Sequence, residues 1–358
     1  MEQGLQCGVS SRPNALPPAL SAYLDLVRFS AAVLVLMSHA APELLGVTPE
    51  VVPGHDAVVV FFVLSGFVIG YVTDGRETRA GAYAVARLSR LWSVCVPALL
   101  VTAVISCFMT TSLAHVTRPV LANLLFLGEW WTGTTGLQIN PPFWSLNYEA
   151  WFYLIWGVWW FTPPGSRGWW TALACAMAGP RVVFLLPLWL VGVAVYYWRP
   201  FLSRFVSVSL VLASLAGWAL ILGFGLRLAA QTWLRGATHG YSYLLGPGTA
   251  ALTDYPFAIL TAMQFVGIRS LVARWSVPRR AARAVVAAAS VTFAVYLFHW
   301  PAIVVVRDLG GMTGWGAVAL VGAACVLAGV VTERSRPAWR HGLTRLVGRA
   351  GGTALRSS

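Results

Sequence analysis

The sequence predicts an all-α integral membrane protein with about ten transmembrane helices around a central cavity and both termini in the cytoplasm. Composition is the first reason: 58% of the 358 residues are hydrophobic, only 10% are charged, and the mean hydropathy is +0.70. Soluble domains carry about 25% charged residues. The second reason is a series of apolar runs, each long enough or nearly long enough to cross a hydrocarbon core of ~30 Å as a helix.

The apolar runs place the spans in order along the chain. The fifth span is short, and Gly179-Pro180 separates it from the sixth, so it is either a half-helix or a tilted partner of the sixth. Val120–Leu127 is too short to cross and is expected to dip into the outer face. Residues 76–91 are expected to form a cytoplasmic interfacial helix that runs into span three. The ten expected spans are 21–40, 54–73, 92–113, 143–161, 168–179, 182–198, 205–227, 247–268, 285–306 and 314–332.

The distribution of arginine sets the orientation. The net charge of +13 comes from 25 arginines and no lysine. With a cytoplasmic N-terminus, the segments expected outside keep only Arg118, Arg181, Arg227, Arg235 and Arg307 of these arginines. This bias follows the positive-inside rule and predicts a multi-pass protein of a bacterial plasma (inner) membrane. Because the arginines punctuate spans, nucleic-acid binding is not expected.

The N-terminal segment and the cysteines give no sign of a signal peptide, a disulfide framework or a metal site. The first twenty residues have no apolar core, so no cleavable signal peptide is expected and they are predicted to be a cytoplasmic tail. The five cysteines, Cys7 among them, lack the spacing of a disulfide framework or a zinc site. No metal is therefore expected.

The first span carries three ionisable residues on one stripe. Arg28 and His39 are eleven residues apart, about three helical turns and roughly 16 Å along the axis, and Asp25 precedes Arg28 by three positions. Such a stripe is costly against lipid, so it is expected to face the protein interior or a wet cavity. A lone His39 fits either packing against a neighbouring helix or catalysis. The aligned Arg28 and Asp25 favour catalysis.

Two further stretches carry charge at opposite ends of the spans. His55 and Asp56 lie at the outer end of the second span, where they are either solvated or part of an acceptor site. Gly66 later in this span is expected to permit close helix packing, and Ser65 beside it is interpreted in the same way. Arg87 and Arg90 share a helical face at the cytoplasmic surface. Their spacing fits binding of anionic lipid head groups and binding of ligand phosphates equally well.

The last two stretches place polar groups deep in apolar segments. Glu149 lies among Trp144, Tyr148, Trp151 and Tyr153, and a carboxylate at that depth invites a histidine or arginine partner. In the ninth span His299 stands just before Pro301, and the proline is expected to open the helix and free a carbonyl.

Taken in order, these stretches resemble the membrane acyltransferase type 3 family. The pattern is Arg-x10-His (Arg28, His39), "FFVLSGF" (Phe61–Phe67), Arg-x-x-Arg (Arg87, Arg90), "WSLxxE" (Trp144–Glu149) and "YLxHWP" (Tyr296–Pro301). The resemblance runs from about Ala22 to Pro337. Two features depart from it: the closing "ERP" of the family is spread into "ERSRP" (Glu333–Pro337), and the region between spans four and nine matches poorly.

The resemblance implies an O-acyltransferase that moves an acyl group, expected to be acetyl, from cytoplasmic acyl-CoA to a hydroxyl of an extracytoplasmic glycan or glycoconjugate. It implies that His39 is the general base or acyl carrier, with Glu149 orienting an imidazole. Donor binding falls to Arg28, Arg87 and Arg90, and acceptor binding to His55, Asp56, Trp144, Tyr148 and His299. The chain then divides into an N-terminal tail (1–20), the acyltransferase domain (21–337) and a basic cytoplasmic C-terminal tail (338–358).

Two other functions compete with this interpretation: an acyltransferase for a small secondary metabolite of the macrolide type, and a noncatalytic polytopic glycan transporter. A transporter is expected to show repeat symmetry with Gly/Pro breaks at matching positions, and the sequence shows no clear repeat. The expected partners are acyl-CoA, a hydroxyl acceptor and the lipid bilayer. A homo-oligomer is left open.

Overall fold

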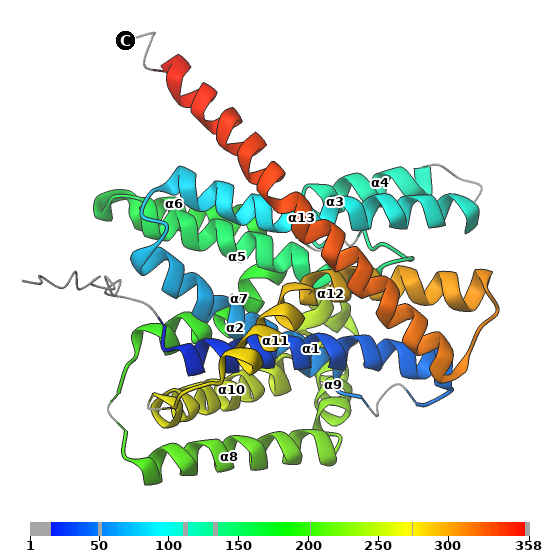
Figure 1. Cartoon of the computed structure of the whole chain (residues 1–358), viewed down its shortest axis with the longest axis horizontal. Coiled ribbons are helices and arrows are strands. Elements are labelled where there is room, and N and C mark those ends of the chain that lie inside the picture. The colour runs from blue at the N-terminus through cyan, green and yellow to red at the C-terminus, as the bar shows by residue number, and fades with distance from the viewer. Residues whose placement is uncertain are drawn as a thin grey trace, which may run out of the picture.

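The computed structural model describes residues 16–48, 52–109, 114–131, 135–200, 202–273 and 275–354. All regular elements within these residues are helical (Figure 1). Residues 1–15, with Cys7 and most of the expected N-terminal tail, lie outside the described residues, as do 110–113 of the third expected span and 355–358. The helices are α1 (Pro18–Leu45), α2 (Gly54–Gly75), α3 (Ala80–Met109), α4 (Ala114–Leu124), α5 (Trp144–Phe161), α6 (Pro164–Ala178), α7 (Pro180–Tyr197), α8 (Arg204–Gly223), α9 (Leu226–Ala237), α10 (Ala251–Val272), α11 (Arg279–Ser290), α12 (Thr292–Val304) and α13 (Gly314–Ala354), with short turns η2 (Pro141–Phe143), η3 (Tyr241–Ala250) and η4 (Val305–Leu309).

Eight helical segments in the described part of the chain are long and apolar enough to cross a bilayer: α1, α2, α3, α7, α8, α10 with the end of η3 before it, α12 continued by η4, and α13. The other two expected spans correspond to α5 and α6. α5 has 18 residues, but its many Trp and Tyr lower its hydropathy, and α6 has only 15 residues. Because these two helices are consecutive, including or omitting both leaves the two chain ends on one side. α1 begins and α13 ends toward the same end of the bundle (Figure 1).

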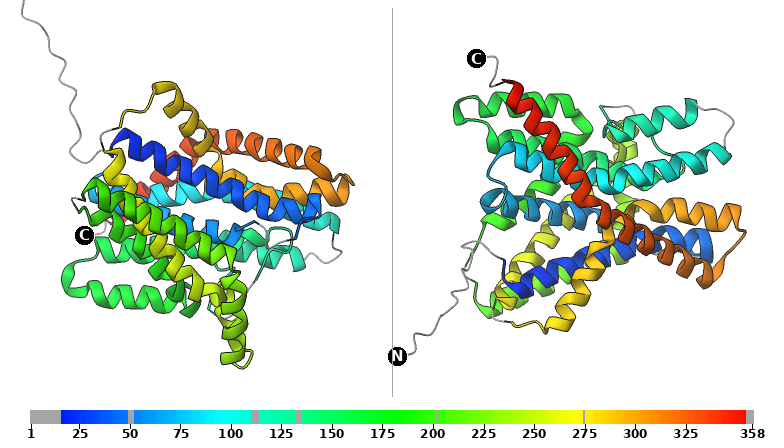
Figure 2. Two further views of the ribbon diagram at one scale, coloured as in Figure 1. Left: turned by 90° about the horizontal axis from the view of Figure 1, so that it is seen from below. Right: turned by 45° about the horizontal axis from the view of Figure 1, so that its top comes forward.

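Three helices differ from the expected boundaries. α3 is one continuous helix of 30 residues, so residues 80–91 run directly into the third span as expected, whereas 76–79 lie outside the helix. The expected span 285–306 is interrupted at Val291, where α11 ends and α12 begins. α13 continues past Pro337, so no break marks the proposed start of the C-terminal tail, and that division stays a prediction. α9 projects from the bundle, as the yellow-green helix in the left view of Figure 2.

Two glycines bring α2 and α7 into direct backbone contact at the centre of the bundle. A Cβ atom on Gly66 would lie 2.0 Å from the carbonyl oxygen of Trp189, and one on Gly192 would lie 1.8 Å from that of Val63. Neither position accepts a side chain unless the helices separate. The packing role predicted for Gly66 is confirmed. α2 is buried along most of its length, which makes it the central helix of the fold.

Pro301 fixes the geometry of α12 as expected from the sequence. Proline has no N–H, so the carbonyl oxygen of Leu297, four residues earlier, receives no helical hydrogen bond from it. The side-chain amide of Asn140 donates to this oxygen at 3.0 Å, and Asn140 is fully buried. The freed carbonyl is therefore satisfied from outside the helix. This contact ties the start of η2 to the helix that carries His299.

Candidate functional site

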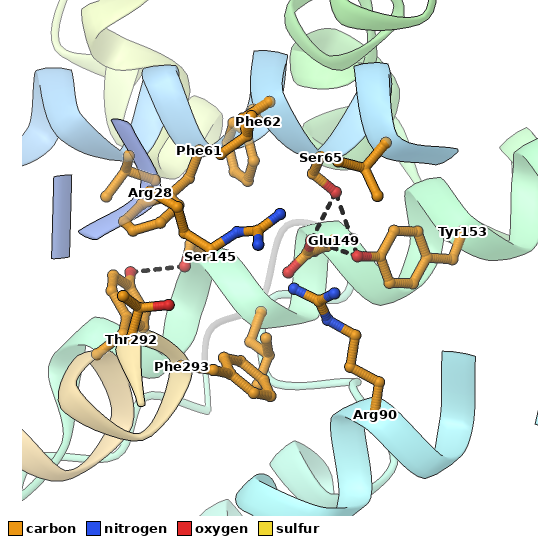
Figure 3. A pocket seen from close by; sticks show the side chains of 15 residues that line it. Arg28, Phe61, Phe62, Ser65, Arg90, Ser145, Glu149, Tyr153, Thr292 and Phe293 are labelled. Atoms are coloured by element: carbon orange, nitrogen blue, oxygen red, sulfur yellow. Dashed lines mark hydrogen bonds between the residues drawn. The ribbon is translucent and has the colours of Figure 1, made fainter. Parts of the chain in front are cut away.

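A narrow cavity of about 70 Å³ lies between α1, α2, α3, α5 and α12, and we name it the Glu149 cavity. Arg28 of α1 and Arg90 of α3 extend into it toward Glu149 from two sides (Figure 3). Both arginines are the eleventh residue of their helix, about 15 Å from its start at 1.5 Å per residue. The structure therefore places Arg90 within the bundle, deeper than the surface position expected from the sequence.

Glu149 is held by hydroxyl groups from two helices. Ser65 donates to Glu149 Oε1 at 2.6 Å, and Tyr153 donates to the same oxygen at 2.5 Å. The indole N–H of Trp189 in turn donates to the Ser65 hydroxyl at 3.2 Å. Ser65 thus belongs to the polar site, which the packing interpretation from sequence missed. The sequence predicted a histidine or arginine partner for Glu149. Arg28 and Arg90 share its cavity, but its hydrogen bonds go to these two hydroxyls, and no imidazole among the described residues lines the cavity.

The three arginines that were expected to bind the donor differ in their partners. Arg28 pairs with Asp25 at 3.1 Å, whereas the guanidinium of Arg90 has no hydrogen bond or ion pair among the described residues. Arg87 pairs with Glu77 at 2.6 Å and lies 5.8 Å from the ring centres of Tyr83 and Tyr153. It lines a separate apolar groove of about 600 Å³ between α3 and α5. The structure therefore brings Arg28 and Arg90 together and keeps Arg87 apart from them.

His39 contacts His299 directly. His39 Nδ1 and His299 Nε2 are 3.0 Å apart, the two rings stack at 5.1 Å, and Trp300 packs edge-on against His39. His299 is completely buried, whereas His39 keeps some exposed surface. His299 was expected to bind the acceptor, but a side chain without exposed surface cannot touch it in this conformation. Its contact is with His39.

The hydrogen bonds of this pair select one tautomer for each ring. His299 Nδ1 lies 3.1 Å from the carbonyl oxygen of Val295, which can only accept, so Nδ1 carries the proton. In neutral His299 the other nitrogen, Nε2, is unprotonated and accepts a hydrogen bond from the N–H of His39 Nδ1. Neutral His39 is then left with an unprotonated Nε2. That nitrogen has the lone pair that a general base requires.

Tyr296 connects the histidine pair to the Glu149 cavity. Its ring lies 6.2 Å from that of His299, and its hydroxyl is 2.6 Å from the Ser145 hydroxyl. Tyr296 and Ser145 both line the cavity that holds Arg28, Arg90 and Glu149. Tyr296 therefore stands between the cavity that holds the arginines and the histidine pair.

A third polar cluster lies where α2 begins, and we name it the outer mouth after the side to which the arginine distribution assigns it. His55 hydrogen-bonds Asp254 at 3.0 Å and stacks on Trp144, with ring centres 5.9 Å apart. Asp56 forms an ion pair with Arg227 of α9, which also lies 3.9 Å from Asp254. The structure thus unites three of the expected acceptor residues with two that the sequence reasoning missed. Asp254 carried a detectable signal, because it is a carboxylate within the expected span 247–268.

Tyr148 does not belong to the accessible part of this cluster. It is fully buried, packs edge-on against Trp144, and its hydroxyl has no hydrogen-bond partner among the described residues.

Within the described residues, no group of three or more His, Cys, Asp or Glu side chains is placed to hold a metal ion. The site is therefore built from arginine, carboxylate, hydroxyl and imidazole groups.

Comparison with known proteins identifies the family of the chain. The model of the acyltransferase domain family matches residues 21–334. The exopolysaccharide production protein ExoZ of Rhizobium meliloti (strain 1021) is 30% identical over 319 residues, which cover 82% of this chain and 92% of ExoZ. The acyltransferase MdmB of Streptomyces mycarofaciens is 32% identical over 143 residues, 37% of this chain and 36% of MdmB. No solved structure matches the chain. The chain therefore belongs to the acyltransferase domain family, and it is a multi-pass membrane acyltransferase.

Proposed function

We propose that this acyltransferase moves a short acyl group, acetyl in the simplest case, from cytoplasmic acyl-CoA to a hydroxyl of a glycan that arrives at the outer mouth. The Glu149 cavity, the histidine pair and the outer mouth follow one another in the order that such a transfer needs. Arginines for an anionic donor lie toward the end of the bundle where α1 begins, the histidine pair follows, and the outer mouth is at the far end. The match to ExoZ along most of both chains supports a polysaccharide acceptor.

The observation that carries the proposal is the contact between His39 and His299. Unprotonated His39 Nε2 removes the proton from the acceptor hydroxyl while its oxygen attacks the thioester carbonyl of the donor. The carbon–sulfur bond then breaks, and the leaving thiolate takes the proton from the imidazolium. His299 acts through His39, because it holds the reactive tautomer and the ring orientation. The same nitrogen also suits a transient acyl carrier, the second role considered for His39.

The outer mouth supplies groups that suit a sugar. Trp144 provides a flat aromatic face, and the His55, Asp56 and Asp254 side chains provide hydrogen-bonding atoms around it. Binding sites of this kind combine aromatic walls with a few placed polar groups. Tyr148 supports Trp144 from the buried side.

The test is transfer from labelled acetyl-CoA by the purified full chain in proteoliposomes. His39→Ala should reduce transfer by about 10² or more, the scale of a lost general base. His341→Ala is the matched control, because His341 is exposed on α13. Transfer by His39→Ala at the wild-type rate would refute the proposed chemistry.

Sidedness is tested in oriented vesicles. Acetyl-CoA is supplied on the face that carries the termini, and an exopolysaccharide oligosaccharide on the other face. Product should form in this arrangement. Product that forms only when both substrates share the terminal face would refute transfer through the membrane, even with His39 catalytic.

A further inference from the structure

A second cavity adjoins the Glu149 cavity on the side where α1 begins. It has a volume of about 210 Å³, and three arginines line it: Arg28, Arg90 and Arg336. We name it the three-arginine cavity. Arg28 and Arg90 line both cavities, as do Thr292 and Phe293 at the start of α12, all four of which Figure 3 labels. The two cavities are therefore neighbours along one wall.

The three arginines come from three different helices. Arg28 belongs to α1, Arg90 to α3 and Arg336 to α13, so their convergence depends on the tertiary fold. Arg336 also lies within electrostatic range of Arg87 and Arg340. Like charges gathered in a partly desolvated space repel one another. A bound anion relieves that repulsion and gains charge-assisted hydrogen bonds.

The acidic residues of this cavity do not cancel its charge. Asp25 pairs with Arg28 at 3.1 Å, and Glu333 lies 4.0 Å from Arg336 in a looser contact. Arg90 keeps no ion pair or hydrogen bond within the described ranges. One guanidinium is thus left unpaired, and a second is held only at the limit of an ion pair. Both are available to an incoming anion.

The size of the cavity suits the phosphate part of a donor. Its volume of about 210 Å³ has room for a pyrophosphate group, and the rest of an extended nucleotide donor would lie outside it. The cavity lies on the side of the Glu149 cavity that faces the start of α1, because Asp25 precedes Arg28 along that helix.

We propose that the three-arginine cavity binds the pyrophosphate of a nucleotide donor and that Arg336 is one of its ligands. This inference deepens the proposed function, because it assigns the phosphates of the donor to a site that excludes Arg87. Arg87 was expected to bind the donor together with Arg28 and Arg90, and in this proposal Arg336 has that role. Arg28 and Arg90 form the wall between the phosphates and the reacting end of the donor.

The test is binding of inorganic pyrophosphate and ADP, measured by calorimetry on the full chain in nanodiscs of neutral lipid. Arg336→Gln should weaken both affinities at least tenfold, the scale of a lost charge-assisted contact. Arg336→Lys should recover part of the loss, because it restores the charge without the two-pronged geometry. Arg334→Gln is the matched control, since Arg334 is exposed and lies two residues away on the opposite face of α13. Arg87→Gln should weaken pyrophosphate binding less than Arg336→Gln does, because Arg87 does not line the cavity.

Equal affinities for Arg336→Gln and Arg334→Gln would overturn the proposal, as would an absence of pyrophosphate binding by the wild-type protein. Nanodiscs that contain phosphatidylglycerol distinguish the other source of phosphate. If this lipid abolishes pyrophosphate binding, a lipid head group occupies the site and the proposal fails. Pyrophosphate binding needs no transfer, so intact binding without acetyl transfer would refute the proposed function alone. Acetyl transfer with an unchanged donor KM in Arg336→Gln would refute this inference alone.

Discussion

Substitution of Gly192 by alanine tests how helix packing supports the Glu149 cavity. The added Cβ would lie 1.8 Å from the carbonyl oxygen of Val63, whereas ordinary contacts of a Cβ begin at 3.4 Å. α2 and α7 must therefore move apart by 1.6 Å at this point. Overpacking of this kind costs about 1–3 kcal/mol, and the rigid backbone on both sides favours the upper part of that range.

The separation also acts on the site, because α2 carries Ser65 and α7 carries Trp189. Their hydrogen bond of 3.2 Å lengthens beyond 3.5 Å, where it no longer counts as one. We expect Gly192→Ala to unfold at a lower temperature and to lose most of its transfer activity. The assays are thermal unfolding in detergent and transfer from labelled acetyl-CoA.

Gly322→Ala is the control for this experiment. A Cβ at Gly322 of α13 meets no atom within 4 Å, so alanine there should be neutral or stabilise the helix by up to about 1 kcal/mol. If both variants unfold and turn over like the wild-type protein, the close contact of α2 and α7 does not exist and the reasoning is wrong.

Four further predictions concern single side chains. His299→Phe should lower kcat about 10-fold or more with little change in the donor KM, because the loss of a hydrogen bond of ~1 kcal/mol and the misplacement of the His39 base slow the chemical step and leave donor binding unaffected. His299→Gln should recover part of the rate. Glu149→Gln keeps an oxygen for Ser65 and Tyr153 but removes the charge between two arginines, and kcat/KM should fall about 10-fold, whereas unchanged kinetics would exclude an electrostatic role. Arg227→Gln should raise the acceptor KM and leave the donor KM unchanged, with exposed Arg235→Gln of the same helix as control; equal acceptor KM values would remove Arg227 from the outer mouth. Burial raises the pKa of Glu129 from 4.5 to about 7, although the charge of Arg181 opposes the shift. Between pH 4.5 and 7 the folded protein therefore binds more protons than the unfolded chain, and this contribution to stability is lost as pH rises through that window. Glu129→Gln should abolish the resulting difference between the unfolding temperatures measured at pH 5 and pH 8.

Several features of the fold could be predicted from sequence because they depend on local chemistry. Apolar runs predicted the membrane helices, Gly66 predicted close packing, and Pro301 predicted a freed carbonyl; the structure confirms all three. The count of ten spans was less secure. α5 is rich in tryptophan, an interfacial residue, and α6 is short, so neither reaches the length and hydropathy of the other eight.

The partners of the charged residues could not be predicted, because spacing gives the face of a helix and not what lies opposite. Arg87 and Arg90 share a face, yet Glu77 from the preceding connection neutralises Arg87. The hydrogen bonds of Glu149 go to hydroxyl groups of α2 and of its own helix, whereas a histidine or arginine partner was expected. Asp254 and Arg227 lie in the region that resembles the family least. Arg336 lies in the stretch where "ERP" is spread into "ERSRP", and only the fold brings it to Arg28 and Arg90.

The hydrogen bond from Asn140 to Leu297 has a consequence for the history of the chain. Without Pro301, residue 301 would supply its own N–H to the Leu297 carbonyl, and that oxygen would no longer depend on the Asn140 amide, which also donates to the Thr102 hydroxyl at 3.3 Å. The proline therefore makes the asparagine advantageous, although 161 positions separate them in the sequence. Relatives that have replaced the proline should tend to have replaced the asparagine as well. Covariation of these two alignment columns would show the dependence of one residue on the other, which neither column shows alone.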